Sequence, residues 1–411
     1  MNRFQFFLVG AITMSLAACG GKSSFSGSSG NPIAGPAANV VTAVVNGGPN
    51  NNAANTLYTT VTICAPGSTT NCQTIDNIEI DTGSSGLRIL AAALTADLPI
   101  QMDSNGNSFA ECTQFVDGYS WGPLALADLT ISQETAQNLP VQVIGDPNFA
   151  TVPSDCANTG PAEDTVAAFG ANGILGVAPP AQDCGSDCAV PNSLGFYYSC
   201  SSATNCVAVA VPVGNQVQNP VTFFPTDNNG VIIELPSVAA TGAASATGAL
   251  VFGIDTQSNN ASGSGTVLAL QTTSGFLSVS LNGTVYPESF LDTGSNGLYF
   301  TDSSLTQCTD SGITGFYCPA STQNFSATVC SYNGSGTCSG TSQQSISFSV
   351  GNAESLFDGN ATYTAFPTLA GTFPSRQSTV DLGLPFFFGR NVYEAFEGKS
   401  TKAGAGPYVS F

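Results

Sequence analysis

Residues 81–89 read Asp-Thr-Gly-Ser-Ser-Gly-Leu-Arg-Ile, and residues 292–300 read Asp-Thr-Gly-Ser-Asn-Gly-Leu-Tyr-Phe. Six of the nine positions in these two stretches are identical. Each stretch follows a short strand-like segment, Ile-Glu-Ile at 78–80 and Ser-Phe-Leu at 289–291. One Asp-Thr-Gly-Ser also makes an ordinary turn, but two copies in the same context indicate an internal repeat.

The repeat continues downstream of each copy. An apolar segment that ends in glycine follows, Ile-Leu-Gly at 174–176 and Val-Asp-Leu-Gly at 380–383. The glycine of the first Asp-Thr-Gly lies 93 residues before Gly176, and that of the second lies 89 residues before Gly383. The matched spacing indicates two similar halves in one chain.

The rest of the sequence has the texture of a β protein. Short runs rich in β-branched and apolar residues, at 59–63, 129–131 and 141–144 for example, alternate with clusters of Gly, Pro, Asn and Ser. Long segments with helical period are scarce, and residues 302–308 are the candidate for a short helix. The pattern predicts an all-β protein with a few short helices.

Together these features resemble the pepsin-like aspartic peptidases, two-lobed all-β enzymes in which each lobe donates one catalytic aspartate. The resemblance covers nearly the whole chain after the N-terminal segment, and it suggests an uncharacterised bacterial lipoprotein family built on that plan. It implies an internally duplicated fold, with an N-terminal lobe at 40–225 and a C-terminal lobe at 226–411. Each lobe would contain one Asp-Thr-Gly-Ser motif.

By this resemblance Asp81 and Asp292 form the catalytic pair. The threonine after each aspartate would lock the two loops together, the glycine would permit a tight turn, and the serine would hydrogen-bond the carboxylate. These supporting residues are Thr82, Gly83, Ser84, Thr293, Gly294 and Ser295.

Paired aspartates suit peptide hydrolysis for a physical reason. Two carboxylates held close together cannot both ionise readily, so one stays protonated. The ionised one can act as a general base on water while the protonated one donates to the substrate oxygen. The resemblance therefore implies a peptide or protein substrate, acidic working pH, a monomer, no cofactor and no metal.

The sequence departs from the family pattern in the segment that covers the cleft. Family members usually carry a Tyr-Gly pair there, whereas the shorter segment at 115–123 has Asp117 and Gly118. Tyr119 and Trp121 are candidates to cover the cleft instead, the alternative being that both are core or turn residues.

Arg88 stands where the family usually has a tryptophan soon after the first motif. We expect it to face Asp117 or another acidic group nearby. The alternative is an exposed arginine at the end of a strand.

Two other functions remain open. One is a catalytically inactive pepsin-like module that binds peptide or glycan ligands in its cleft, and the other is a structural surface lipoprotein. Both aspartates and both Thr-Gly-Ser contexts are present, which favours the enzyme. Loss of the Tyr-Gly pair favours the binding module.

The charge composition excludes several classes of function. The chain has 7 Lys and Arg against 27 Asp and Glu, and it has no histidine. Catalytic triads with histidine and histidine-ligated metals are therefore excluded. Between Lys22 and Arg376 the only basic residue is Arg88. We therefore expect no nucleic-acid partner, because no cationic track could neutralise phosphates.

The N-terminus resembles a bacterial lipoprotein signal. Residues 1–18 combine a basic start with an apolar run, and residues 16–19 read Leu-Ala-Ala-Cys. We expect cleavage before Cys19, lipidation of its sulfur and a Gly/Ser-rich tether at 19–39. The alternative is an ordinary secretory signal. Gly20, in place of an inner-membrane retention aspartate, favours an anchor in the outer membrane, at its periplasmic face or the cell surface.

The remaining twelve cysteines are an even number, as expected for disulfides in an oxidising compartment. A metal site is the competing interpretation, but no CxxC pair occurs. Proximity in sequence suggests five pairs and leaves Cys112 and Cys156 as the remaining two, although sequence alone does not determine the connectivity. The candidate pairs are Cys64–Cys72, Cys112–Cys156, Cys184–Cys188, Cys200–Cys206, Cys308–Cys318 and Cys330–Cys338.

Overall fold

The computed structural model describes residues 32–191, 195–334, 337–373 and 377–411. The expected signal peptide at 1–18, the lipidation site Cys19 and most of the tether at 19–39 lie outside the described residues. These three remain predictions.

Most of the regular structure is β, as predicted. One sheet has 15 strands, in the order β10-β9-β5-β6-β7-β4-β8-β3-β2-β1-β12-β11-β21-β24-β13. Its strands are β1 Val40–Val45, β2 Leu57–Cys64, β3 Cys72–Asp81, β4 Ser85–Leu90, β5 Ser108–Gln114, β6 Tyr119–Ile131, β7 Glu134–Ile144, β8 Gly173–Val177, β9 Tyr197–Ser202, β10 Asn205–Ala208, β11 Gly230–Glu234, β12 Ala246–Phe252, β13 Leu268–Ala269, β21 Asn391–Ala395 and β24 Tyr408–Ser410.

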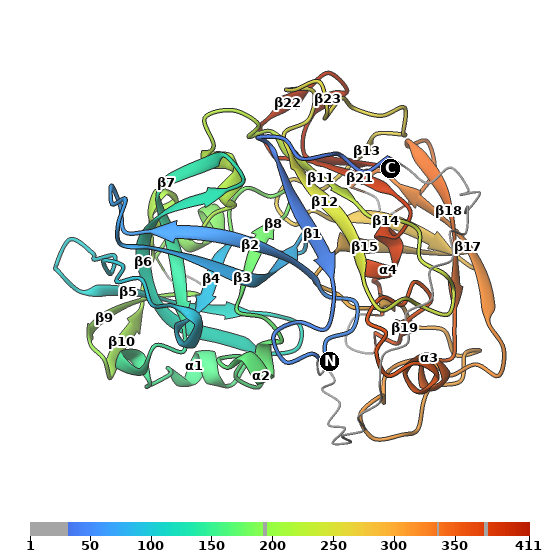
Figure 1. The fold of residues 1–411 in the computed structure, drawn as a ribbon, viewed down its shortest axis with the longest axis horizontal. Helices are drawn as coiled ribbons and strands as arrows, with labels where there is room; N and C mark the ends of the chain where they lie inside the picture. The colour runs from blue at the N-terminus through green and yellow to red at the C-terminus, as the bar shows by residue number, and fades with distance from the viewer. Residues whose placement is uncertain (1–31, 192–194, 335–336, 374–376) are drawn as a thin grey trace, which may run out of the picture.

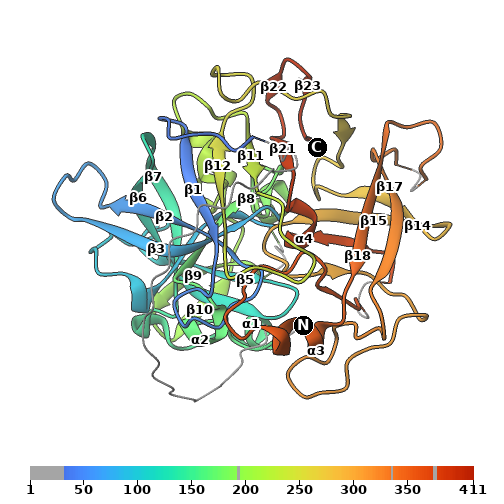
Figure 2. The same ribbon diagram turned by 45° about the vertical axis from the view of Figure 1, so that its right-hand side comes forward.

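A second sheet has seven strands, in the order β18-β17-β14-β15-β20-β16-β19, and β22 pairs with β23 alone. Figure 2 shows β14, β15, β17 and β18 together on the right of the molecule. The strands are β14 Leu277–Leu281, β15 Thr284–Asp292, β16 Leu298–Tyr299, β17 Gln323–Cys330, β18 Gln343–Val350, β19 Ala370–Gly371, β20 Asp381–Gly383, β22 Ser400–Thr401 and β23 Gly404–Ala405.

The α-helices of the described residues are short: α1 Ser154–Ala157, α2 Val166–Phe169, α3 Ala353–Gly359 and α4 Leu384–Phe387. The helix predicted at 302–308 is wrong. There the Asp302 carboxylate accepts a hydrogen bond from the Ser304 backbone N–H at 2.9 Å. The end of the segment instead pairs with another part of the chain, because Gln307 forms an antiparallel bridge with Tyr317 and the Cys308 N–H donates to the Phe316 carbonyl at 2.9 Å.

The large sheet joins the two halves of the sequence. β1 pairs antiparallel with β12 from Val40–Val251 to Val45–Ala246, and it also pairs with β2. Figure 1 shows β1 beside β12 in the middle of the molecule, with β11 and β21 next to them. The first strand thus stabilises the contact between sequence halves. The lobe boundary at 225 and 226 remains a prediction.

The central strands are rich in apolar residues and are buried along their whole length. Every residue of β4, β8 and β11 is buried. One apolar core includes side chains from both sheets, such as Ile80, Leu250 and Leu291. A strand buried on both faces forms a rigid support for loops at its end.

The six disulfides confirm the five pairs suggested by proximity in sequence and the pair of remaining cysteines. They join Cys64–Cys72, Cys112–Cys156, Cys184–Cys188, Cys200–Cys206, Cys308–Cys318 and Cys330–Cys338. Six bridges indicate an oxidising, extracytoplasmic compartment. Within the described ranges, the helices are too short and insufficiently apolar to cross a membrane.

Candidate active site

Asp81 and Asp292 occupy the same position in two similar strand arrangements. Asp81 ends β3, which runs parallel to β8 and places Asp81 opposite Gly176. Asp292 ends β15, which runs parallel to β20 and places Asp292 opposite Gly383. β4 and β16 then return antiparallel to β8 and β20. The sequence repeat therefore corresponds to a repeated local structure.

The distal glycines are needed because the backbone passes very close to them. A Cβ on Gly176 would lie 2.7 Å from the Ser84 carbonyl oxygen. A Cβ on Gly383 would lie 2.6 Å from the Ser295 carbonyl oxygen. Each glycine thus lets its strand pack directly against an Asp-Thr-Gly-Ser loop.

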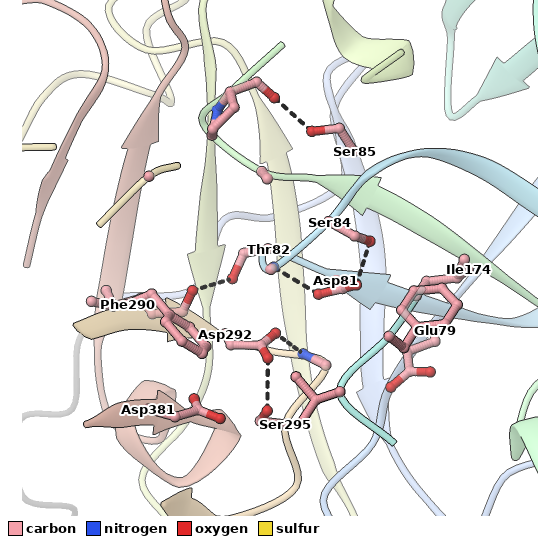
Figure 3. Close-up of a pocket in the computed structure, with 18 of the residues that line it drawn as sticks. Glu79, Asp81, Thr82, Ser84, Ser85, Ile174, Phe290, Asp292, Ser295 and Asp381 are labelled. Carbon is pink, nitrogen blue, oxygen red and sulfur yellow. Dashed lines mark hydrogen bonds between the residues drawn. The ribbon is translucent and has the colours of Figure 1, made fainter. Parts of the chain in front are cut away.

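Within each loop the aspartate accepts two hydrogen bonds, one from the backbone N–H two residues later and one from the serine hydroxyl three residues later (Figure 3). For Asp81 the N–H bond is 2.7 Å long. For Asp292 the N–H and hydroxyl bonds are 2.8 and 2.7 Å long. These bonds fix the orientation of both carboxylates.

The two threonines connect the loops. The Thr82 N–H donates to the Thr293 hydroxyl oxygen, and the Thr293 N–H donates to the Thr82 hydroxyl oxygen, both at 3.1 Å. The Thr293 hydroxyl donates to the Ile80 carbonyl at 2.7 Å, and the Thr82 hydroxyl donates to the Leu291 carbonyl at 3.4 Å. Both threonines are buried. Two loops 211 residues apart in sequence thus form one rigid unit.

The motif glycines show how closely the loops approach. A Cβ on Gly83 would lie 2.6 Å from the Oδ1 atom of Asp292. A Cβ on Gly294 would lie 2.7 Å from the Oδ1 atom of Asp81. Each loop therefore packs against the carboxylate of the other, and the structure brings the two sequence-predicted aspartates together.

Their proximity alters the acidity of the pair. The pKa of Asp292 lies well above its ordinary value, first because the group is buried and next because of the charges of Asp81 and Asp381. The hydrogen bond from Ser295 acts in the opposite direction. The pair therefore retains a proton at a pH where an isolated aspartate is ionised.

Three further carboxyl groups lie near the pair, and sequence reasoning did not single them out. Asp381 on β20 and Glu394 on β21 are buried, and burial raises the pKa of each well above its ordinary value. Glu79 on β3 is also buried. The available sequence signal was an acidic residue inside a short apolar segment, at 78–80 and at 380–383.

A cavity of about 460 Å³ lies over these groups, lined by both aspartates. Its size falls in the ordinary range for ligand sites. Aromatic side chains contribute much of its apolar wall, and these are Phe115, Phe196, Phe276, Phe290, Tyr299 and Phe373. The cavity thus combines apolar surface with a carboxylate pair.

The turn between β5 and β6 also lines the cavity, through Phe115, Val116 and Asp117. Val116 is exposed although it is apolar. Gly118 lies in the same turn against the Pro161 carbonyl, where a Cβ would come within 2.5 Å of the oxygen. Part of the segment expected to cover the cleft therefore borders the cavity.

Tyr119 and Trp121 lie elsewhere. They pack in a separate buried cluster with Tyr198 and Cys112 and are not among the residues that line the cavity. The Trp121 indole N–H donates to the Phe149 carbonyl at 2.8 Å, and its ring contacts Tyr198 edge-on. Their contacts are those of core residues.

Arg88 is fully buried, which excludes the exposed alternative. Its guanidinium forms ion pairs with Glu111 at 2.8 Å and Asp183 at 2.9 Å, and it donates to the Thr113 hydroxyl at 2.8 Å. Burial raises the pKa of Glu111 to about 7, although the Arg88 charge acts against this rise. Asp183 and Thr113 also line the cavity, so Arg88 holds part of its wall in place.

The fold and site define a mostly β, disulfide-rich protein in which two Asp-Thr-Gly-Ser loops meet beneath one cavity. Residues 35–411 match the family described as Protein of unknown function (DUF3443), and the chain belongs to this family. No curated protein matches it significantly.

Proposed function

We propose that this protein is an aspartic endopeptidase and that Asp81 and Asp292 are its catalytic pair. The observation that carries the proposal is the joining of the two motif loops by reciprocal bonds between Thr82 and Thr293. That joining places each aspartate against the opposite loop.

The repeated strand arrangement supports a pepsin-like, duplicated plan for the molecule. In both copies a parallel strand pair places the aspartate opposite a glycine, and a third strand returns antiparallel. We assign one copy to a lobe at 40–225 and the other to a lobe at 226–411.

The proposed reaction is general acid–base catalysis. The ionised carboxylate takes a proton from water as the water oxygen bonds to the scissile carbonyl carbon. The protonated carboxyl, on the Asp292 side, gives its proton to the carbonyl oxygen. The C–N bond then breaks as the amine nitrogen takes the proton from the first carboxyl. A hydroxyl of the intermediate returns a proton to the carboxylate on the Asp292 side. The pair then again has one ionised and one protonated carboxyl group.

Cleavage assays with a protein substrate test this proposal. An unfolded protein substrate should be cleaved at acidic pH, and a statine-type transition-state mimic should block cleavage. Chelators and reagents for Ser or Cys nucleophiles should have no effect. Failure to cleave at any pH, together with binding of the mimic, would support a catalytically inactive peptide-binding module instead. The observation that favours this second candidate is Asp117, which lines the cavity at the position before Gly118 where the family has a tyrosine.

We also propose that the protein is exported and lipid-anchored in the outer membrane through Cys19. The six disulfides support export. The variant Cys19→Ala should lack the acyl anchor and leave the membrane fraction after a high-salt wash. Equal retention of variant and wild type would contradict the anchor.

A further inference from the structure

Three buried carboxyl groups that line the cavity have no role in the proposed reaction, those of Glu79, Asp381 and Glu394. Asp381 is 2% exposed and lines the cavity beside the catalytic pair. Its Oδ1 atom is buried and has no hydrogen-bond partner within the described residues. A buried polar atom without a partner costs free energy unless a ligand supplies the missing bond. Asp381 is therefore a candidate ligand-binding group.

The strand arrangement places Asp381 two residues before the position that faces Asp292. It lies opposite Phe290 in the parallel pair of β15 and β20. In the first copy, the matching pair is Glu79 opposite Ile174. All four side chains line the cavity. Each side of the catalytic pair thus has one acidic and one apolar side chain, with Glu79 and Asp381 on opposite sides (Figure 3).

The charge of the cavity favours a cation. Its described lining residues include seven acidic side chains and no lysine or arginine. The acidic ones are Glu79, Asp81, Asp117, Asp183, Asp292, Asp381 and Glu394. Burial favours the protonated form of Asp381 while the cavity is empty. A substrate cation would favour the ionised form, because it supplies both a counter-charge and hydrogen-bond donors, and charge-assisted bonds are the strong ones. An acidic substrate side chain would be repelled there.

The composition of the chain agrees with such a preference. It has only 7 Lys and Arg in 411 residues. Of the basic residues that the structure describes, Arg88 is buried and Lys402 is the exposed one. A peptidase that cuts beside basic residues would find few sites on its own surface.

We propose that Asp381 forms the base of a subsite that takes a lysine or arginine side chain of the substrate, adjacent to the scissile bond. This inference rests on the proposed peptidase function. Phe290 would pack along the aliphatic part of that side chain while Asp381 receives its charged end.

Two peptide series test the subsite in the wild-type protein. Fluorogenic peptides carry lysine or norleucine, which has a similar aliphatic length without the charge, next to the scissile bond on either side. We expect kcat/KM to be at least about tenfold higher for one lysine peptide than for its norleucine partner, as expected for loss of a charged hydrogen bond. Mapping of cuts in an unfolded protein should place them beside Lys or Arg.

The variant Asp381→Leu should abolish or reverse the lysine preference, measured as the ratio of kcat/KM for the lysine peptide to kcat/KM for its norleucine partner. Asp381→Asn should abolish the lysine preference while keeping a side chain of nearly the same shape as aspartate. Asp310→Asn is the matched control, because Asp310 is exposed and does not line the cavity. It should keep the preference.

The outcomes separate the two proposals. Equal cleavage of lysine and norleucine peptides by the wild type would overturn the subsite and leave the peptidase intact. A lysine preference that persists in both Asp381 variants would also overturn it. If no peptide is cleaved and statine-type mimics with lysine or norleucine both fail to bind, the peptidase proposal fails, and the subsite fails with it.

Discussion

At the scale of single residues, the site depends on small side chains placed where larger ones would collide. Gly83 and Gly294 each pack against the carboxylate of the opposite loop. The serine and threonine hydroxyls of the motifs then hold the carboxylates and the loops in place. The proposed chemistry therefore requires the close approach of the two backbone loops as well as the two aspartates.

The first prediction concerns these glycines. Gly83→Ala should reduce peptidase activity by about 100-fold or more, because its Cβ would lie 2.6 Å from an Asp292 oxygen and must displace that carboxylate. Gly214→Ala is the control, since its Cβ would have no atom within 4 Å. Kinetics and circular dichroism should show a folded but nearly inactive Gly83 variant. Activity within threefold of wild type would contradict the geometry.

At the scale of elements, the disulfides stabilise loops of very different length. Cys112–Cys156 connects β5 to α1 across 44 residues, whereas Cys184–Cys188 spans four. Closing a longer loop removes more entropy from the unfolded chain. The two bridges should therefore contribute unequally to stability.

The second prediction follows from that difference. Replacing Cys112 and Cys156 with alanine should lower the free energy of unfolding by about 4 kcal/mol, and replacing Cys184 and Cys188 should lower it by about 2 kcal/mol. Thermal unfolding of both variants and of the wild type shows which bridge contributes more to stability. A larger fall in Tm for the short bridge would contradict the prediction.

The repeat and the cysteine spacing were readable from sequence because they are local patterns. The aspartates, their supporting residues and the five short-range disulfides belong to this group, whereas Cys112 and Cys156, 44 residues apart, were paired only as the two cysteines left over. The partners of Arg88 were not readable, because Glu111 and Asp183 lie 23 and 95 residues away in sequence. Nothing in the local pattern around residues 302–308 distinguished a turn from a helix.

The other features that could not be predicted from the sequence depend on contacts between residues far apart in the chain. β1 pairs with β12, roughly 200 residues later, and no local signal specifies that contact. Asp381 and Glu79 each lie in a short apolar segment. The apolar neighbours predict that the segment is buried, whereas the acidic side chain itself predicts exposure. Only the fold shows that burial prevails and that both line one cavity.

At the scale of the whole molecule, the part of the chain that the structure describes has more buried acidic side chains than ion pairs that acid would break. Burial raises the pKa of Glu134 to about 7, with a further rise from the Asp227 charge, and raises that of Glu111 to about 7. Burial also raises the pKa of Asp381 and Glu394. The stabilisation from such groups is complete below their unfolded pKa and is lost as the pH rises through their folded pKa.

The third prediction is therefore that stability declines toward neutral pH. Tm should be highest near pH 4 to 5, just below and around the unfolded pKa of carboxylic acids, and should fall between about pH 5 and 7. Below about pH 4 the hydrogen-bonded Asp103 and Asp255, whose pKa values are lowered, oppose further gain. Thermal unfolding by circular dichroism from pH 3 to 8 measures this. A Tm that rises steadily to pH 7 would contradict the account.

The most direct test of the central claim is the digestion of an unfolded protein across pH 2 to 7 by wild type, Asp81→Asn and Asp292→Asn. The account predicts that the wild type cleaves only in the acidic part of this range, where the pair holds one proton. It predicts that each variant loses turnover completely while remaining folded, because neither carboxylate can act as both acid and base. Asp310→Asn should match wild type. Undiminished cleavage by either active-site variant would contradict the claim.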